Sequence, residues 1–341
     1  MILLLARFLA AICLALMVHP ATAQEFYRGK QINFVVSADA GNSYDTFARL
    51  LARHLAKHIP GEPHILVQNM PGAGGLRATN WLFNVAPRDG LTIGMINNTL
   101  AFDPLYGNRL AQFEAVKFNW LGTPSQESAM LLVWHTVPVN TIEEAARREL
   151  TLSATGSGST PAFFARVLAS IFNLKVKLIV GYKSQTEGFL GMERGENDGN
   201  ASPFWTSLTA DNPSWIAEKK IKVLVYYGAT RNPEIPGPYV MDLIADPEKR
   251  AMMELAQAGL AMGRPVTAPP GVDPEKVAIL RKAFEAVLSD GEYLAECARA
   301  RLNCSNPSTG SQVLEFVKKI YASPPDAVEK IRAIYTEGQK N

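Results

Sequence analysis

Two stretches of the chain place small and polar residues where a predicted strand turns into a predicted helix. The first stretch, residues 39–45, follows the apolar run 32–36, and the second, residues 157–160, follows the apolar run 150–154. A helix that begins in such a turn leaves its first backbone N–H groups unpaired, and its dipole adds partial positive charge there. Each turn is therefore a candidate binding seat for an anion. We call them the first seat and the second seat.

The small and polar members of these turns are the candidate ligand-binding residues. Because the seats lie far apart in the sequence, we expect one small anionic ligand to be held between two lobes. The simpler alternative is that both turns are only tight connections between a strand and a helix. The candidates are Asp39, Gly41, Asn42, Ser43 and Asp45 in the first seat, and Ser157, Gly158, Ser159 and Thr160 in the second.

Patterns that would indicate catalysis are weak. His54 and His58 have the spacing of a metal-binding pair on a helix, but the Glu of a metalloprotease motif is missing between them. We expect solvent-facing histidines, and neither a metal nor a cofactor. Asp39 or Asp45 could serve a secreted enzyme as an acid–base group, although a turn residue and a first-turn carboxylate are the simpler interpretation. The sequence therefore favours a binding protein over an enzyme.

The N-terminus reads as an export signal. Residues 1–18 are apolar except for Arg7, and Ala21-Thr22-Ala23 follows as a cleavage site. We predict a signal peptide over residues 1–23, cleaved near Ala23, and a periplasmic location; the alternative is an uncleaved membrane anchor. Lys and Arg are spread along a chain of net charge +2, which gives no footprint for nucleic acid.

Two cysteines remain after the predicted signal peptide, and an exported protein meets an oxidising compartment. Cys297 and Cys304 flank the end of a predicted helix over residues 291–301. A disulfide that closes this turn and a pair of buried thiols are both compatible with the sequence.

Predicted strands and helices alternate along the chain, which indicates α/β lobes with largely parallel sheets. We expect the chain to cross between the lobes within residues 119–135, which show no clear helix pattern, and again within residues 228–238, which are rich in Pro and Gly. The predicted division is lobe 1 over residues 24–124, lobe 2 over 125–227 and the mostly helical remainder of lobe 1 over 228–341.

An ordered set of short motifs resembles the Bug family of extracytoplasmic solute receptors, the binding subunits of tripartite tricarboxylate transporters. The resemblance runs through the whole chain after the predicted signal, and it rests on the order of the motifs. They are 27–32 (YRGKQI), the Gly-x-Ser-x-Asp turn at 41–45, 69–75 (NMPGAGG), 86–92 (APRDGLT), 103–106 (DPLY), 156–160 (GSGST), 181–183 (GYK), 195–199 (GENDG) and 268–272 (APPGV).

The resemblance implies a two-lobed periplasmic binding protein fold, type II-like, with the ligand cleft between the lobes. It implies that a ligand carboxylate is held by the two seats, and that Asn98, Tyr182 and Ser202 line the same cleft. It also implies transfer of a small carboxylated molecule to the membrane subunits of a tripartite transporter, and we expect a monomer. A ligand-dependent partner of a membrane sensor kinase would have the same fold, so this alternative stays open.

The first seat departs from the family pattern. Family members usually carry Pro-Gly-Gly there, whereas residues 40–42 of this chain read Ala-Gly-Asn and follow Asp39. A carboxylate beside an anion seat weakens that seat unless the carboxylate points away or pairs with a cation of the ligand. We therefore expect the first seat to set the ligand choice, and a ligand other than a simple dicarboxylate or tricarboxylate. Tyr44, Phe204 and Trp205 could add an aromatic wall, but for Phe204 and Trp205 we favour the lobe core.

Overall fold

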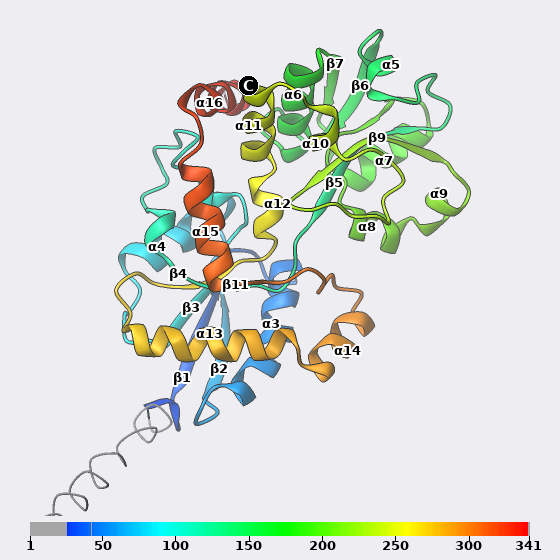
Figure 1. Ribbon diagram of the computed structural model, residues 1–341. Helices are drawn as coiled ribbons and strands as arrows, with labels where there is room; N and C mark the ends of the chain where they lie inside the picture. The colour runs from blue at the N-terminus through cyan, green and yellow to red at the C-terminus, as the bar shows by residue number, and fades with distance from the viewer. Residues whose placement is uncertain (1–25, 42, 340–341) are drawn as a thin grey trace, which may run out of the picture.

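The computed structural model describes residues 26–41 and 43–339 of the chain, which form two sheets and the helices around them. The predicted signal peptide, its cleavage at Ala23 and the predicted binding residue Asn42 lie outside the described residues. In Figure 1 the first sheet lies in the lower part of the molecule and the second sheet in the upper part. The two-lobed α/β architecture that the sequence predicts is confirmed.

The first sheet takes strands from both ends of the chain. Its order is β11-β4-β10-β3-β1-β2, and β1 runs parallel to β2 and β3. The strands β4, β10 and β11 join in antiparallel pairs, so the sheet is mixed and not largely parallel as predicted. The strand bounds are β1 Gln31–Val36, β2 His64–Asn69, β3 Thr92–Met95, β4 Asn119–Thr123, β10 Val266–Ala268 and β11 Ser308–Thr309.

The second sheet is also mixed. Its order is β7-β6-β8-β5-β9, with β6 parallel to β7 and β8, and β5 antiparallel to β8 and β9. The antiparallel strand β5 is the first after the chain leaves the first sheet, so no helical crossover precedes it to impose a parallel direction. The bounds are β5 Ser128–Trp134, β6 Glu149–Ala154, β7 Lys175–Val180, β8 Gly199–Asn200 and β9 Ile221–Gly228.

Helices cover both sheets and run between them (Figure 1). Around the first sheet lie α3 (Ser43–Leu55), η1 (Ala56–His58), η2 (Ala73–Gly75), α4 (Leu76–Asn84), η3 (Leu100–Phe102), η4 (Ala115–Lys117), α13 (Pro274–Leu288), α14 (Gly291–Arg299) and α15 (Gly310–Tyr321). Around the second lie α5 (Ile142–Ala145), α6 (Thr160–Phe172), α7 (Gln185–Glu193), α8 (Trp205–Asp211), α9 (Pro213–Ala217) and α10 (Val240–Leu243). The helices α11 (Pro247–Ala256), α12 (Ala258–Met262) and α16 (Pro325–Gln339) complete the chain.

The helix that follows the first seat shows how the pattern of residues builds the core. Phe47, Leu50, Leu51 and Leu55 recur on one face of α3 and are buried against the first sheet. This spacing of three and four residues places one apolar stripe toward the core. The same stripe fixes the rotation of α3, and with it the direction in which the first seat opens.

The chain leaves the first sheet through residues 124–127, inside the predicted crossing, and returns to it at β10. Residues 228–238 stay beside the second sheet, because the Tyr226 N–H donates to the Pro238 carbonyl and the Tyr239 hydroxyl donates to the Gly228 carbonyl. The return runs along α11 and α12, and α16 then packs on α11 and α6. We propose that the second boundary between the lobes lies near residues 258–265 rather than at 227.

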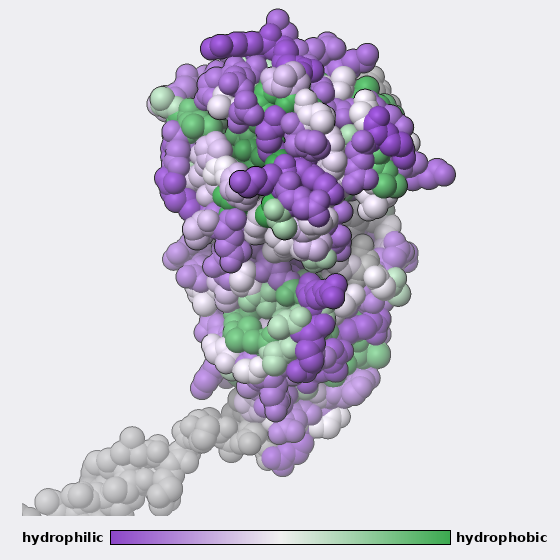
Figure 2. Space-filling model, turned by 90° about the vertical axis from the view of Figure 1, so that its right-hand side faces the viewer, coloured by the Kyte–Doolittle hydropathy of each residue, from purple (hydrophilic) through white to green (hydrophobic). Residues whose placement is uncertain are grey.

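On the face that Figure 2 shows, small green apolar areas lie among purple hydrophilic groups. Large exposed apolar side chains are scattered over several elements: Leu66, Val85, Leu110, Val180, Leu190 and Leu294. Each helix within the described part of the chain is too short or too polar to span a lipid bilayer.

Candidate functional site

A cavity of about 870 Å³ lies between the lobes and brings residues of both seats to one place. Ser43 and Tyr44 line it from the first seat, and Ser157, Gly158 and Thr160 line it from the second. Asn98, which follows β3, also lines the cavity as predicted from the family resemblance. These lining residues come from both lobes, which is the geometry of a ligand cleft.

In the first seat, Asp45 holds the turn together instead of facing the cavity. The Gly41 N–H donates to Asp45 Oδ2 at 2.9 Å, and the Arg49 guanidinium donates to the same oxygen at 3.0 Å. The Asn69 amide donates to Asp45 Oδ1 at 2.9 Å. Burial favours a higher pKa, but the hydrogen bonds from Arg49, Gly41 and Asn69 outweigh it and hold the pKa of Asp45 below its ordinary value. Asp45 is therefore an ionised anchor of the first seat.

The other predicted residues of the first seat differ in their placement. Asp39 and Gly41 are exposed and do not line the cavity. Tyr44 lies at the cavity wall, where its hydroxyl accepts a hydrogen bond from the Asn98 N–H at 3.1 Å. The structure gives no support to the expectation that Asp39 weakens this anion seat, because water screens the charge of an exposed carboxylate that lies outside the cavity.

The second seat has the predicted form of a small-residue turn that opens a helix. Ser159 is the N-cap of α6, and both its N–H and its hydroxyl donate to the Gly156 carbonyl, at 3.1 and 2.7 Å. These bonds turn Ser159 away from the cavity, so it shapes the loop while its neighbours line the wall. The Arg166 guanidinium donates to the Ser157 carbonyl at 2.6 Å and fixes the loop from the next turn of the helix.

Two residues that the resemblance placed in the cleft have other neighbours here. The Tyr182 hydroxyl accepts a hydrogen bond from the Asn197 amide at 3.1 Å, and the Ser202 N–H donates to Asn200 Oδ1 at 3.0 Å. Neither residue lines the cavity in this structure. Their contact with a ligand stays a prediction.

The aromatic residues of the second lobe divide between core and cavity. Trp205 is buried in the apolar cluster behind β5 and β9, as favoured from the sequence. Phe204 is half-buried: it packs against the main core cluster, as favoured from the sequence, and it also lines the cavity. Phe204 is the extended N-cap of α8 and the helix begins with Trp205, and the two rings pack against different apolar clusters.

The sequence analysis missed a carboxylate at another part of the cavity wall. Asp103 lies in the 103–106 motif, lines the cavity and is only 4 % exposed. Its Oδ2 accepts a hydrogen bond from the Asn108 amide at 2.7 Å. Burial raises the pKa of Asp103 to about 6, although the Asn108 hydrogen bond opposes this shift. The 103–106 motif was the feature of the sequence that pointed to this segment. The sequence of the motif does not show that the carboxylate is buried beside a cavity.

A buried ion pair joins residues 124–127 to the proposed second boundary between the lobes, residues 258–265. Arg264 Nη1 lies 2.9 Å from Glu127 Oε1, and the two side chains are 11 % and 2 % exposed. The Thr206 hydroxyl of α8 donates to the other Glu127 oxygen at 3.1 Å, and the Arg264 N–H donates to the Thr123 hydroxyl at 3.0 Å. The guanidinium also lies over the Phe47 ring at 4.6 Å. Arg264 therefore ties the first-seat helix to both crossings.

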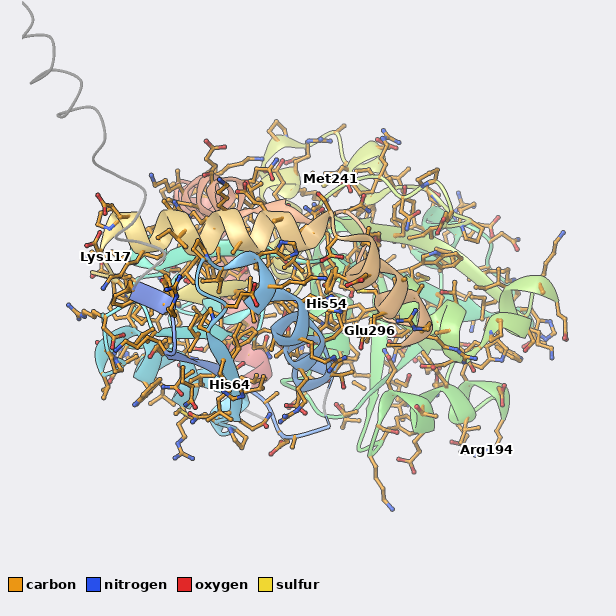
Figure 3. The ribbon with its side chains drawn as sticks, turned by 90° about the horizontal axis from the view of Figure 1, so that it is seen from below. His54, His64, Lys117, Arg194, Met241 and Glu296 are labelled. Carbon is orange, nitrogen blue, oxygen red and sulfur yellow. A yellow bond between two sulfur atoms is a disulfide. The ribbon has the colours of Figure 1, made fainter. Side chains whose placement is uncertain are left out.

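The expectation of solvent-facing histidines is wrong for His54, which is buried, whereas His58 is half-buried. His54 Nε2 lies 2.6 Å from a carboxylate oxygen of Glu296 of α14. Figure 3 shows these two residues near each other, seen from below. His58 Nε2 lies 2.9 Å from Asp290. His54, Asp290 and Glu292 offer ligand atoms within 4.8 Å of one another, but Lys57 already pairs with both carboxylates at 2.7 Å. The cluster clamps α14 to the first-seat helix.

The two remaining cysteines form a disulfide, which decides between the alternatives left open by the sequence. It joins Cys297 of α14 to Cys304 in the loop that follows. The Asn303 amide in this loop donates to the Gln126 carbonyl in the first crossing at 2.9 Å. The disulfide therefore braces a loop that contacts the crossing between the lobes.

Comparisons with known proteins agree with this geometry. Residues 47–324 match the family model of the tripartite tricarboxylate transporter family receptor. A UPF0065 protein of Cupriavidus necator is 26 % identical over 300 residues, which cover 85 % of this chain and 84 % of that protein.

Among solved structures, a ligand-free TctC solute-binding protein from Polaromonas has a TM-score of 0.71 at 17 % identity, over 91 % of this chain and 99 % of that one. An R. palustris protein with adipate has a TM-score of 0.59 at 20 % identity, over 89 % and 97 % of the two chains. These likenesses show the two-lobed fold of periplasmic binding proteins, and the family model covers most of the sequence. The chain belongs to the tripartite tricarboxylate transporter receptor family.

Proposed function

We propose that this receptor captures a small carboxylated molecule between its lobes in the periplasm and delivers it to the membrane subunits of a tripartite transporter. One observation carries the proposal: a single cavity of about 870 Å³ is lined by residues of both seats. The adipate in the R. palustris neighbour supports a carboxylate as ligand. A cleavable signal over residues 1–23 would deliver the chain, acting as a monomer, to that compartment.

The chemistry of the second seat fits a carboxylate. α6 is long enough to have a substantial dipole, and Pro161 lies in its first turn, where the missing N–H costs nothing. Gly158 and Thr160 line the cavity beside this helix start. A carboxylate placed there accepts backbone N–H bonds in a partly dry cleft, where such bonds are stronger than in water.

The first seat completes the grip from the other lobe. Ser43 begins α3 at the cavity wall, and Asp45 holds the preceding turn in place through Gly41 and Asn69. Closing the lobes brings the two helix starts toward one ligand, and residues 124–127 and 258–265 are the segments about which the lobes would move. Neither lobe alone would enclose the ligand.

A calorimetric titration of the mature chain with adipate, malate, citrate and aromatic monocarboxylates tests the proposal. We expect at least one carboxylate to bind and to raise the melting temperature. Gly158→Phe should abolish that binding because it fills the second seat. The control is Gly156→Phe, since a Cβ at Gly156 meets no atom within 4 Å and Gly156 does not line the cavity. The second seat would be refuted if Gly158→Phe bound the carboxylate as tightly as the parent chain and Gly156→Phe do. It would also be refuted if no carboxylate bound to the parent chain.

A catalytic use of Asp45 has little structural support. Both of its oxygens are engaged by Arg49 and Asn69 outside the cavity. Asp39 is exposed and away from the cavity wall. The family is one of receptors, and the geometry of both carboxylates agrees with binding.

A further inference from the structure

The cavity has one wall whose chemistry the binding of a carboxylate does not explain. Aromatic rings lead from the helix of the second seat toward Asp103. The ring centres of Phe163 and Tyr335 lie 6.4 Å apart, and those of Tyr335 and Tyr106 lie 5.6 Å apart. All three rings and Asp103 line the same cavity. We call these four residues the aromatic–acidic wall.

Asp103 has no cationic partner among the residues that the structure describes. Its hydrogen bond comes from the neutral Asn108 amide. The nearby tyrosine hydroxyls are engaged elsewhere: Tyr106 donates to the Leu255 carbonyl at 2.7 Å, and Tyr321 donates to the Ala101 carbonyl at 2.8 Å. A carboxylate that is 4 % exposed and lacks a counter-charge is costly to ionise.

The arginines near this wall do not neutralise Asp103. Arg109 lines the cavity but is exposed, and no ion pair within 4.0 Å joins it to Asp103. Arg332 of α16 donates to the Leu105 carbonyl and to Glu329. Arg166 is bound to the Ser157 carbonyl at the other seat. The negative charge of Asp103 therefore faces the cavity without an internal partner.

We propose that the aromatic–acidic wall is a subsite for a cationic group of the ligand, so that the receptor selects a carboxylate that also carries an ammonium group. The inference rests on the proposed function, because the seats are to hold the carboxylate end. Asp103 would form an ion pair with the ammonium, and the faces of Tyr106, Tyr335 and Phe163 would receive its N–H or N–methyl groups. The ligand class is an amino acid, an ω-amino carboxylate or a betaine.

A purely structural role for Asp103 explains less. Its single side-chain bond from Asn108 closes the turn over residues 103–108, and a neutral Asn or Ser could accept the same bond. An ionisable group at a buried cavity wall adds an electrostatic cost that the turn does not require. A ligand cation removes that cost, and a ligand without a cation does not.

Matched ligand pairs test the subsite directly. The mature chain is titrated by calorimetry with pentanoate and 5-aminopentanoate, hexanoate and 6-aminohexanoate, and the trimethylammonium form of each amine. Each pair has the same carboxylate and chain length, so the ratio of dissociation constants reports the cationic end alone. We expect the ammonium or trimethylammonium form of at least one length to bind at least ~10-fold more tightly at pH 7.5.

Asp103→Asn should bring that ratio close to one, because it keeps the size of the side chain and removes its charge. Asp211→Asn is the matched control: Asp211 is exposed at the end of α8 and lies outside the cavity, so the ratio should stay as in the parent chain. Tyr335→Leu is a second variant, on α16, and should lower the preference for the trimethylammonium forms.

The outcomes separate this inference from the proposed function. If carboxylates bind but the charged and uncharged partners of each pair bind equally, the cationic subsite is wrong and the carboxylate receptor stands. If Asp103→Asn keeps the preference while its circular dichroism matches the parent, Asp103 does not hold the cation. If no carboxylate binds, with or without an ammonium group, both the proposed function and the subsite fail.

Discussion

Removing the charge of Asp103 should change how the stability of the ligand-free protein depends on pH. Burial raises the pKa of this carboxyl group from 3.8 to about 6 in the folded chain. The folded state therefore holds the proton more tightly than the unfolded state does. Asp103 favours folding most below pH 4, and this contribution is lost as the pH rises toward 6.

The size of the effect follows from the two pKa values. Each pKa unit corresponds to about 1.4 kcal/mol, so the shift from 3.8 to about 6 amounts to roughly 3 kcal/mol. In Asp103→Asn this dependence is absent, because the amide does not titrate. Because about 0.6 kcal/mol of this total is already lost at pH 4, the parent chain should lose roughly 2.5 kcal/mol relative to the variant between pH 4 and pH 7.5.

Urea unfolding of both proteins at several pH values between 4 and 7.5 measures this difference. The difference between parent and variant cancels most other titrating groups. The tyrosines that face Asp103 do not interfere: burial raises the pKa of Tyr335 to about 12, and burial also raises the pKa of Tyr106 and Tyr321. None of them changes charge in this range.

The result would refute the reasoning if the two stability curves stayed parallel from pH 4 to 7.5. Asp103 would then be ionised at an ordinary pKa and solvated in the ligand-free protein. A constant offset between the curves is expected from the altered hydrogen bond with Asn108 and does not count against the prediction. Saturating the parent with a bound ω-amino carboxylate should reduce the loss at pH 7.5, since the ligand cation supplies the missing counter-charge.

Two substitutions elsewhere test the crossings between the lobes. Gly263→Ala should destabilise the protein by more than about 3 kcal/mol in urea unfolding, because Gly263 has φ +55° and its Cβ would lie 1.7 Å from the Ser125 carbonyl oxygen. The control Gly41→Ala, at φ +80° with open space around the new Cβ, should cost only about 1 kcal/mol. Cys304→Ser should cost about 2.5 kcal/mol, the loop-closure value for a short disulfide loop, and a loss below 0.5 kcal/mol would show that the loop at Asn303 orders itself without the disulfide.

Local patterns predicted most of the elements, because strand and helix periods depend on neighbours in the sequence. The apolar run before the second seat is β6, and the helix predicted to follow that seat is α6. Thr141 is an N-cap of the same local kind, since its hydroxyl accepts the Glu144 N–H of α5 at 3.2 Å. Such signals act over one turn of chain, so the sequence alone contains them.

The direction of strands and the path between lobes could not be read in the same way. β4, β10 and β11 pair across long separations, and their antiparallel order depends on which segments meet in three dimensions. Residues 228–238 have the composition of a linker, yet the Tyr226 N–H and the Tyr239 hydroxyl hold both ends to the second sheet. Composition indicates irregular backbone but not where that backbone is attached.

The lining of the cavity could be predicted where it depends on the backbone, but not where it depends on tertiary burial. Ser43, Gly158 and Thr160 line the cavity because a strand-to-helix turn always exposes its helix start. Asp45 lies in the predicted turn, but there it anchors the turn and does not line the cavity, because Arg49 and Asn69 bind its carboxylate oxygens. The side-chain partners that decide between a ligand contact and an anchor lie up to 24 residues away in the sequence.

The buried charge of Asp103 indicates that the aromatic–acidic wall, and not the first seat, selects the ligand under our proposal. The sequence suggested Asp39 as the acidic residue that sets the ligand, but Asp39 is exposed and lies outside the cavity. Asp103 is buried at the wall, and a charge in such surroundings discriminates between ligands far more strongly than an exposed one. Under the proposed function the two seats hold the carboxylate end of the ligand, and that end is common to every acid. The group at the other end of that acid must satisfy or tolerate Asp103, and this requirement is where one carboxylate can be told from another.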